Sequence, residues 1–159
     1  MRRLVIHLVS AALAASLSSV CAAGDLPYDE HADAAQQIRL AEQAARSGHK
    51  DVLLVFGANW CPDCRALDSA LHDKAGVVIG DRFVIVKVDV GNFDKNLDLV
   101  KHYGVPLQKG IPAAAVVSGD DNLLYVTKAG ELADARRMGE PAIADFFSRI
   151  VADAGSARR

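Results

Sequence analysis

The sequence predicts a single α/β domain in which a central mixed β-sheet is covered by helices on both faces. Two continuous apolar runs, at residues 51–57 and 83–89, are typical of strands buried within a sheet. A helical pattern follows each run, and two later apolar runs separated by turn-forming residues predict a hairpin. Strands that alternate with helices and then form a hairpin indicate one mixed sheet between two helical layers.

Three amphipathic helices are predicted in the first two thirds of the chain, because apolar residues recur there at helical spacing. Each ends near a glycine, the residue that most often terminates a helix. They cover residues 29–47, the stretch from just after Cys61 to about Asp73, and residues 97–103. A loop with Pro106 follows, because proline lacks a backbone donor and restricts the residue before it.

The last third of the chain predicts the hairpin and a closing helix. Residues 113–117 and 123–127 are its strands, and the loop between them is dense in turn-forming residues. The closing helix has Pro141 near its first turn and ends before Gly155. Its apolar face consists of Ile143, Phe146, Phe147, Ile150 and Val151.

Residues 1–23 have the order of a secretory signal peptide: a positive start, an apolar run and small residues at the end. We expect cleavage after Ala23, because His7 and several serines interrupt the run and leave it short of the roughly 20 strongly apolar residues of a spanning helix. An alternative is lipid attachment at Cys21, as in bacterial lipoproteins, although Val20 is larger than the residue usual in that signal.

The mature chain, residues 24–159, is long enough to bury one core and is predicted to be one domain without a membrane span. The full chain has a formal net charge of −2, and removal of the signal arginines makes the remainder more acidic. Lysines and arginines cluster only at residues 136–137 and 158–159. Nucleic acid is therefore not an expected partner.

Two cysteines separated by two residues carry the candidate chemistry. Cys61 and Cys64 lie where the first buried strand passes into a helix, so Cys61 is placed at a helix N-terminus, which favours a thiolate. We predict that Cys61, with the more exposed sulfur, attacks a disulfide and that the buried Cys64 resolves the mixed disulfide. The two cysteines also pair readily with each other in an oxidising compartment.

The residues around these cysteines resemble the thioredoxin family over nearly the whole mature chain. The resemblance rests on the first strand, the sequence Phe-Gly-Ala-Asn-Trp-Cys-Pro-Asp-Cys at residues 56–64, the helix after it, and the later Gly-Ile-Pro at 110–112. It implies a thioredoxin fold with about four to five strands. It also implies a cis peptide bond between Ile111 and Pro112, beside the cysteine pair.

Contacts with client proteins, whose disulfides are exchanged, are expected around the same motif. The resemblance implies that the Ile111 backbone forms hydrogen bonds with an extended client segment, a small case of strand addition. Trp60 stands beside the first cysteine and is expected to shield the site. We therefore predict that Trp60, Pro62, Ile111 and Pro112 bind the client.

Other uses of a Cys-x-x-Cys pair fit the sequence less well. A structural zinc site takes about four protein ligands, whereas the mature chain has no second cysteine pair and only scattered histidines. Covalent haem requires a histidine directly after Cys64, where Arg65 stands. Two alternatives stay open: a binding module whose cysteines hold a soft metal such as Cu(I), and an interaction protein that keeps only the fold.

The chain also departs from the thioredoxin pattern. Thioredoxins carry a buried acid six residues before the attacking cysteine, where this chain has Val55, and Lys87 matches a lysine of thioredoxins on the neighbouring strand. Asp63 stands between the cysteines, and its negative charge is expected to raise the pKa of Cys61. The segment 128–138 is longer than the corresponding link in minimal thioredoxins and is either a client surface or a loop.

These observations predict a protein thiol–disulfide oxidoreductase of the cell envelope, periplasmic or otherwise secreted, which needs no cofactor. The charge of Asp63 favours a reductant or electron relay over a strong oxidant, and an upstream redox partner is then required. An isomerase is a less favoured variant, because relatives with that role usually carry a dimerisation domain and residues 24–48 are too short for one. We expect a monomer.

Overall fold

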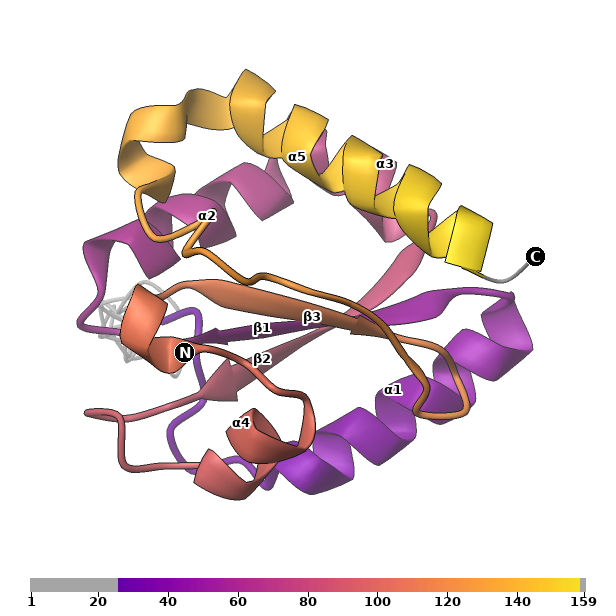
Figure 1. Cartoon of the computed structure of the whole chain (residues 1–159), viewed down its shortest axis with the longest axis horizontal. Coiled ribbons are helices and arrows are strands. Elements are labelled where there is room, and N and C mark those ends of the chain that lie inside the picture. The colour runs from indigo at the N-terminus through magenta and orange to yellow at the C-terminus, as the bar shows by residue number, and fades with distance from the viewer. Residues whose placement is uncertain (1–25, 158–159) are drawn as a thin grey trace, which may run out of the picture.

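The computed structural model describes residues 26–157 and contains one four-stranded sheet in the order β2-β1-β3-β4 (Figure 1). The strands are β1 (Asp51–Gly57), β2 (Phe83–Asp89), β3 (Ala113–Val117) and β4 (Leu123–Val126). β1 pairs parallel with β2 and antiparallel with β3, and β3 pairs antiparallel with β4. The predicted mixed sheet and hairpin are confirmed, whereas the predicted signal peptide and Cys21 lie outside the described residues.

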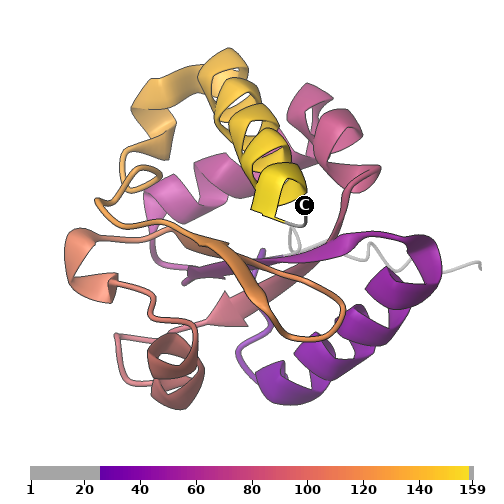
Figure 2. The same ribbon diagram turned by 45° about the vertical axis from the view of Figure 1, so that its right-hand side comes forward.

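Helices cover both faces of the sheet, as predicted (Figures 1 and 2). One layer holds α1 (Ala34–Gly48) and α4 (Leu97–His102); the other holds α2 (Pro62–His72), α3 (Lys74–Gly80) and α5 (Ala135–Ala157). Alternate residues of β1 point into the two cores, with Leu54 and Phe56 under α1 and Leu53 and Val55 under α2 and α5. All seven residues of β1 are buried, which explains its unbroken apolar sequence.

The first helix is shorter than the predicted segment 29–47. It starts at Ala34 because the Asp33 carboxylate caps it, accepting a hydrogen bond from the Gln36 N–H at 2.9 Å. Gly48 lies within the helix, and His49 adopts the left-handed conformation at the C-cap with φ 55°. The residues before Asp33 lie outside the helix and extend toward the cysteine motif.

Two further elements differ from the predicted pattern. The chain bends at Asp73 and a separate helix, α3, follows it, because the buried Ile79 anchors a glycine-containing segment in the core under α5. β2 is an edge strand, and Val84, Ile85 and Lys87 are only half-buried, although a fully buried strand is predicted there. Both differences come from tertiary placement, which local patterns do not report.

The closing helix extends beyond its predicted limits at both ends, from Ala135 to Ala157. Its first turn and its long part meet at Gly139, whose φ of 71° and ψ of 160° are not helical. Pro141 lies just after this break, near the first turn of the long part. None of the helices within residues 26–157 has the length and apolar character that crossing a bilayer requires.

Candidate active site

Cys61 occupies the N-cap of α2. Its sulfur accepts a hydrogen bond from the Cys64 N–H at 3.1 Å, and Pro62 fills the first helical position, where its missing N–H costs nothing. Both thiols are free. Cys61 is 4 % exposed and Cys64 is fully buried, so Cys61 is the more accessible of two buried cysteines.

Hydrogen bonding gives the two thiols different acidities. Donation from the Cys64 thiol lowers the pKa of Cys61 to about 7, and the backbone N–H groups of Cys64 and Asp63 add to this effect against the opposing effect of burial. The same bond raises the pKa of Cys64, and burial raises it further. Near neutral pH, Cys61 is therefore partly thiolate while Cys64 keeps its proton.

The loop with Ile111 and Pro112 lies against the first cysteine. The Cys61 thiol donates to the Ile111 carbonyl with an S–O distance of 3.5 Å, and the peptide bond between Ile111 and Pro112 is cis. Both loop residues are buried. Fifty residues of sequence separate this loop from Cys61, and the pairing of β3 with β1 brings them together.

Trp60 is half exposed and lies against the loop after β2. Its Nε1–H donates to the Gly91 carbonyl at 2.9 Å, and its ring meets the edge of Phe93 with centroids 5.8 Å apart. An open, mostly apolar groove starts at Phe93 and ends at Gly110, next to Ile111. It is lined by Phe93, Leu97, Val100, Val105, Leu107, Gln108 and Gly110.

Asp63 is held by Arg136 and acts on Cys61 through its charge. Its carboxylate accepts hydrogen bonds from Arg136, at 3.0 Å from the backbone N–H and 3.1 Å from Nε. Burial opposes ionisation of Asp63, but these bonds and the Arg136 charge lower its pKa. The Asp63 charge raises the pKa of Cys61, as predicted, but hydrogen bonds to the sulfur outweigh this effect, so the pKa of Cys61 is lowered overall.

The segment 128–138 gains a structural role from this pair. Arg136 lies in the first turn of α5, and Asp63 lies in the first turn of α2, so one carboxylate ties the two helix starts together. In the sequence, Arg136 is recognisable only as part of a small basic group. Its partner is 73 residues away in the chain, and no local pattern indicates such a pair.

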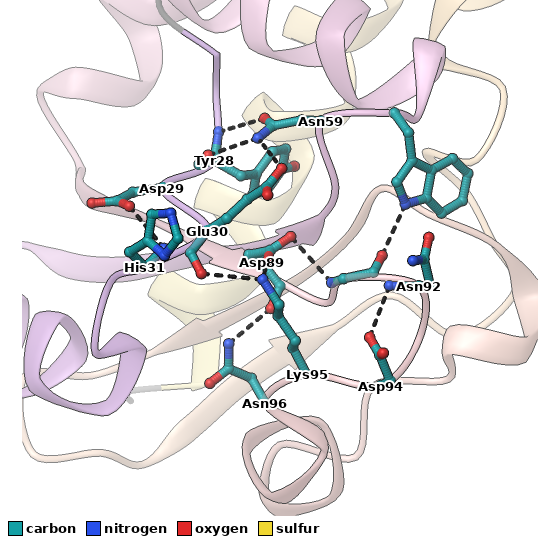
Figure 3. Close-up of polar contacts among 12 residues, drawn as sticks. Tyr28, Asp29, Glu30, His31, Asn59, Asp89, Asn92, Asp94, Lys95 and Asn96 are labelled. Carbon is teal, nitrogen blue, oxygen red and sulfur yellow. Dashed lines mark hydrogen bonds and ion pairs between the residues drawn. The ribbon is translucent and has the colours of Figure 1, made fainter.

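Asn59, two residues before Cys61, clamps the backbone of Tyr28 (Figure 3). The Tyr28 N–H donates to Asn59 Oδ1 at 3.0 Å, and Asn59 Nδ2 donates to the Tyr28 carbonyl at 2.8 Å and to the Glu30 carboxylate at 2.9 Å. Lys95 holds the same segment by donating to the Glu30 carbonyl at 3.1 Å and to the Asp89 carboxylate at 3.0 Å. The N-terminal segment is thus fixed beneath the cysteine motif.

Two polar side chains, those of Lys87 and Tyr28, lie near the buried side of the cysteine motif. Val55 is fully buried in apolar surroundings, and its sheet partner Lys87 forms an ion pair with Asp68 on α2. Lys87 Nζ also lies 5.8 Å from the centroid of the Tyr28 ring. Burial raises the pKa of Tyr28 well above its ordinary value, and the charges of Cys64 and Cys61 raise it further. Tyr28 has no sequence signal that links it to the cysteines.

The chain is similar to known proteins over most of its length. A family model described as thioredoxin-like matches residues 33–118. A crystal structure of a disulphide isomerase from Xylella fastidiosa Temecula1 is 54 % identical with a TM-score of 0.77, and the match covers 80 % of this chain and 98 % of that one. None of the curated proteins matches the chain.

A more distant structure shares the fold. The C-terminal domain of DsbD from Neisseria meningitidis, in its oxidised form, is 22 % identical with a TM-score of 0.52 over 74 % of this chain and 96 % of that one. The family model covers more than half of the chain, and the Xylella structure covers four fifths of it at high identity. The chain therefore belongs to the thioredoxin-like family and is a thiol–disulfide oxidoreductase.

Proposed function

We propose that the protein exchanges disulfides with client proteins, with Cys61 as the attacking thiol and Cys64 as the resolving thiol. The position of the Cys61 sulfur carries this assignment. It lies 3.1 Å from the Cys64 N–H and 3.5 Å from the Ile111 carbonyl, at a helix N-terminus and beside a loop suited to an extended peptide.

The reaction proceeds in two exchange steps. The Cys61 thiolate attacks one sulfur of a client disulfide, a bond forms between them, and the other client sulfur leaves as a thiolate that takes a proton from water. Cys64 then releases its proton to water and attacks the Cys61 sulfur, and the second client sulfur leaves as a thiolate that takes a proton from water. The client disulfide is reduced and the Cys61–Cys64 pair is oxidised.

Client contacts are assigned to the surface around the first cysteine. Trp60, Pro62, Ile111 and Pro112 border Cys61 in sequence or in space, and the apolar groove from Phe93 to Gly110 continues that surface. The Ile111 backbone would bind the client chain, while the groove would accept an apolar client side chain. Unfolded or partly folded clients expose such side chains together with their cysteines.

The acidity of Cys61 supports a reductant or an electron relay over a strong oxidant. A pKa of about 7 equals the value of about 7 typical of thioredoxin, whereas the strong oxidants of this fold have an attacking cysteine near 3.5. A very acidic thiol stabilises the reduced form and makes the protein oxidising. An upstream thiol donor would return the pair to its reduced form.

We place the mature protein, residues 24–159, outside the cytoplasm as a monomer. The signal-like order of residues 1–23 supports export to the periplasm or beyond. Mass spectrometry of the exported protein tests this placement: a mature chain that starts at Gly24 supports it, and a lipid on Cys21 supports the anchored alternative. Sedimentation of the mature chain tests the monomer.

Reduction of a protein disulfide tests the proposed chemistry. With insulin as client and dithiothreitol as electron source, the wild type is expected to accelerate reduction, and Cys61→Ser to abolish the acceleration. Cys64→Ser is expected to trap the client on Cys61 as a mixed disulfide. Acceleration by Cys61→Ser equal to that of the wild type would overturn the assignment of the attacking thiol.

Isomerase activity is a second candidate, favoured by the identity with the Xylella disulphide isomerase. Isomerisation needs only a thiolate that attacks the client and is later displaced by a client thiol. Cys61 is therefore required, whereas Cys64 is needed mainly to release a client that stays bound as a mixed disulfide. Recovery of activity from scrambled ribonuclease separates the two functions. Recovery by both wild type and Cys64→Ser supports an isomerase, while recovery by neither supports a dedicated reductant or relay.

A Cu(I)-holding module is the non-enzymatic alternative, because thiolates favour soft metals. Within the part of the chain that the structure describes, no group of three or more His, Cys, Asp or Glu side chains is placed to hold a metal. Titration of the reduced protein with Cu(I), compared with the Cys61→Ser, Cys64→Ser double variant, tests it. Tight stoichiometric binding without turnover would favour the module over the oxidoreductase.

A further inference from the structure

The hydroxyl of Tyr28 is buried beneath the cysteine pair without a hydrogen bond of its own. Tyr28 is 2 % exposed, and among residues 26–157 its hydroxyl is the one buried side-chain oxygen or nitrogen that lacks a partner. Buried polar groups are normally paired, because an unpaired one costs stability. An unpaired hydroxyl beside reactive thiols therefore calls for a functional explanation.

The space at Gly57 shows that the Tyr28 hydroxyl and the Cys64 sulfur lie close together. A Cβ placed on this last residue of β1 would lie 2.2 Å from the Tyr28 hydroxyl oxygen and 2.8 Å from the Cys64 sulfur. Both atoms therefore border the same small space, which only glycine leaves open. The phenol hydroxyl therefore lies near the buried sulfur of the resolving cysteine.

The surrounding residues fix the phenol in this place. Asn59 holds the Tyr28 backbone through two hydrogen bonds, and Asn59 itself is two residues from Cys61. Lys87, paired with Asp68, lies near the face of the Tyr28 ring. Tyr28 precedes residues 33–118, the part that the family model matches, so it comes from a segment outside the matched core.

We propose that the Tyr28 hydroxyl is a catalytic hydrogen-bond donor to the Cys64 sulfur, in the step that resolves the mixed disulfide. The proposal rests on the roles given above to Cys61 and Cys64. When Cys64 releases its proton to water, negative charge forms on its sulfur and accepts the Tyr28 hydrogen bond. The Cys64–Cys61 bond then forms, the Cys61–client bond breaks, and the client thiolate takes a proton from water.

Tyr28 keeps its own proton throughout this step. Burial and the neighbouring cysteine charges hold its pKa well above the ordinary range, so it donates and does not act as a base. A hydrogen bond donated by Tyr28 favours the Cys64 thiolate and lowers the pKa of Cys64, against the opposing effects of Cys61 and burial. In the reverse direction, the same bond stabilises Cys64 as the leaving group. Tyr28 thus assists the resolving cysteine in a chain that has Val55 at the position of the thioredoxins' buried acid.

Single-turnover kinetics with a small chromophoric disulfide separate the two steps. The reduced mature protein, residues 24–159, is mixed with the symmetrical disulfide of nitrothiobenzoate. This reagent releases one coloured thiolate when Cys61 attacks it and a second when Cys64 resolves the mixed disulfide. In Tyr28→Phe, the first release is expected at the wild-type rate and the second about tenfold slower, the size of effect of a hydrogen bond to a charged group. The pH dependence of the second release should shift to higher pH.

Tyr103→Phe is the matched control. Tyr103 is also buried, but its hydroxyl donates to Asp121 at 2.9 Å, so its loss should leave both releases unchanged. Wild-type rates for both releases in Tyr28→Phe, or equal slowing of both, would overturn the role of Tyr28. A wild-type protein that releases only one thiolate would instead overturn the proposed resolving role of Cys64, and the Tyr28 proposal with it.

Discussion

At the residue scale, the reactivity of Cys61 depends on hydrogen bonds to its sulfur. The thiol of Cys64 and two backbone N–H groups stabilise the thiolate, and the nearby Asp63 carboxylate opposes them. Arg136 donates its hydrogen bonds to Asp63, and none of those found within residues 26–157 joins it to the Cys61 sulfur. The moderate acidity of Cys61 is the balance of these short-range effects.

Removal of the Cys64 donor should make Cys61 less acidic. In the wild type, the rate of Cys61 alkylation by iodoacetamide is expected to rise with pH around a midpoint of about 7. In Cys64→Ala, the thiol donor is lost and the midpoint should move toward the ordinary cysteine value of about 8.5. Cys64→Ser keeps a donor and should shift less. An unchanged midpoint in Cys64→Ala would show that Cys64 does not control Cys61.

At the element scale, Asp63 joins the starts of α2 and α5. It accepts from the backbone and side chain of Arg136, and it therefore serves α5 as an N-terminal partner supplied by another helix. The side chain of Asp63 is 12 % exposed, whereas that of Arg136 is 57 % exposed. The stabilising effect of the Asp63–Arg136 pair therefore depends on the charge of Asp63, its more buried member.

The Asp63 contact predicts a loss of stability in acid. The folded pKa of Asp63 is lowered, so its contribution is present above the unfolded value of about 3.9 and is lost as pH falls through the folded pKa. Asp63→Asn should therefore reduce the free energy of unfolding near neutral pH, and the difference from the wild type should shrink below about pH 4. Urea unfolding across this range tests it, with exposed Asp145→Asn as control. A difference independent of pH would contradict the account.

Gly139 separates the first turn of α5 from the long part, and its backbone permits this break. Its φ of 71° disfavours residues with a Cβ, although the nearest atom to an added Cβ is Pro141 Cδ at 3.9 Å. Gly139→Ala should therefore lower the free energy of unfolding by about 1–3 kcal/mol through backbone strain. Gly80→Ala, in open space on α3, should be neutral or stabilising. Equal effects of the two changes in thermal unfolding would rule out strain at Gly139.

At the scale of the whole molecule, the site lies at the end of β1, where four separated segments meet. These are the clamped segment 28–30, the motif 59–64, the loop 111–112 and the start of α5 at Arg136. Asn59 joins the first two across 31 residues of sequence. The two helical layers hold these segments against one sheet, so the site is a product of the fold.

The parts with a local pattern were predictable from the sequence. β1 is a central strand with an unbroken apolar run, and Cys61, Cys64 and the 110–112 loop belong to a recognisable motif. The long-range polar contacts could not be predicted from the sequence, because the Asp63–Arg136 and Asn59–Tyr28 pairs join distant segments with no shared periodicity. α3 escaped prediction because its burial depends on α5, not on its own short sequence.

The redox equilibrium between the protein and glutathione tests whether Cys61 and Cys64 form a reducing disulfide pair. The mature protein is incubated with graded ratios of reduced and oxidised glutathione, and free thiols on Cys61 and Cys64 are counted by alkylation and mass. A single Cys61–Cys64 disulfide with a midpoint near that of thioredoxin, about −270 mV, is the predicted result. A midpoint near the about −120 mV of strong oxidants, or no disulfide between these cysteines, would contradict it.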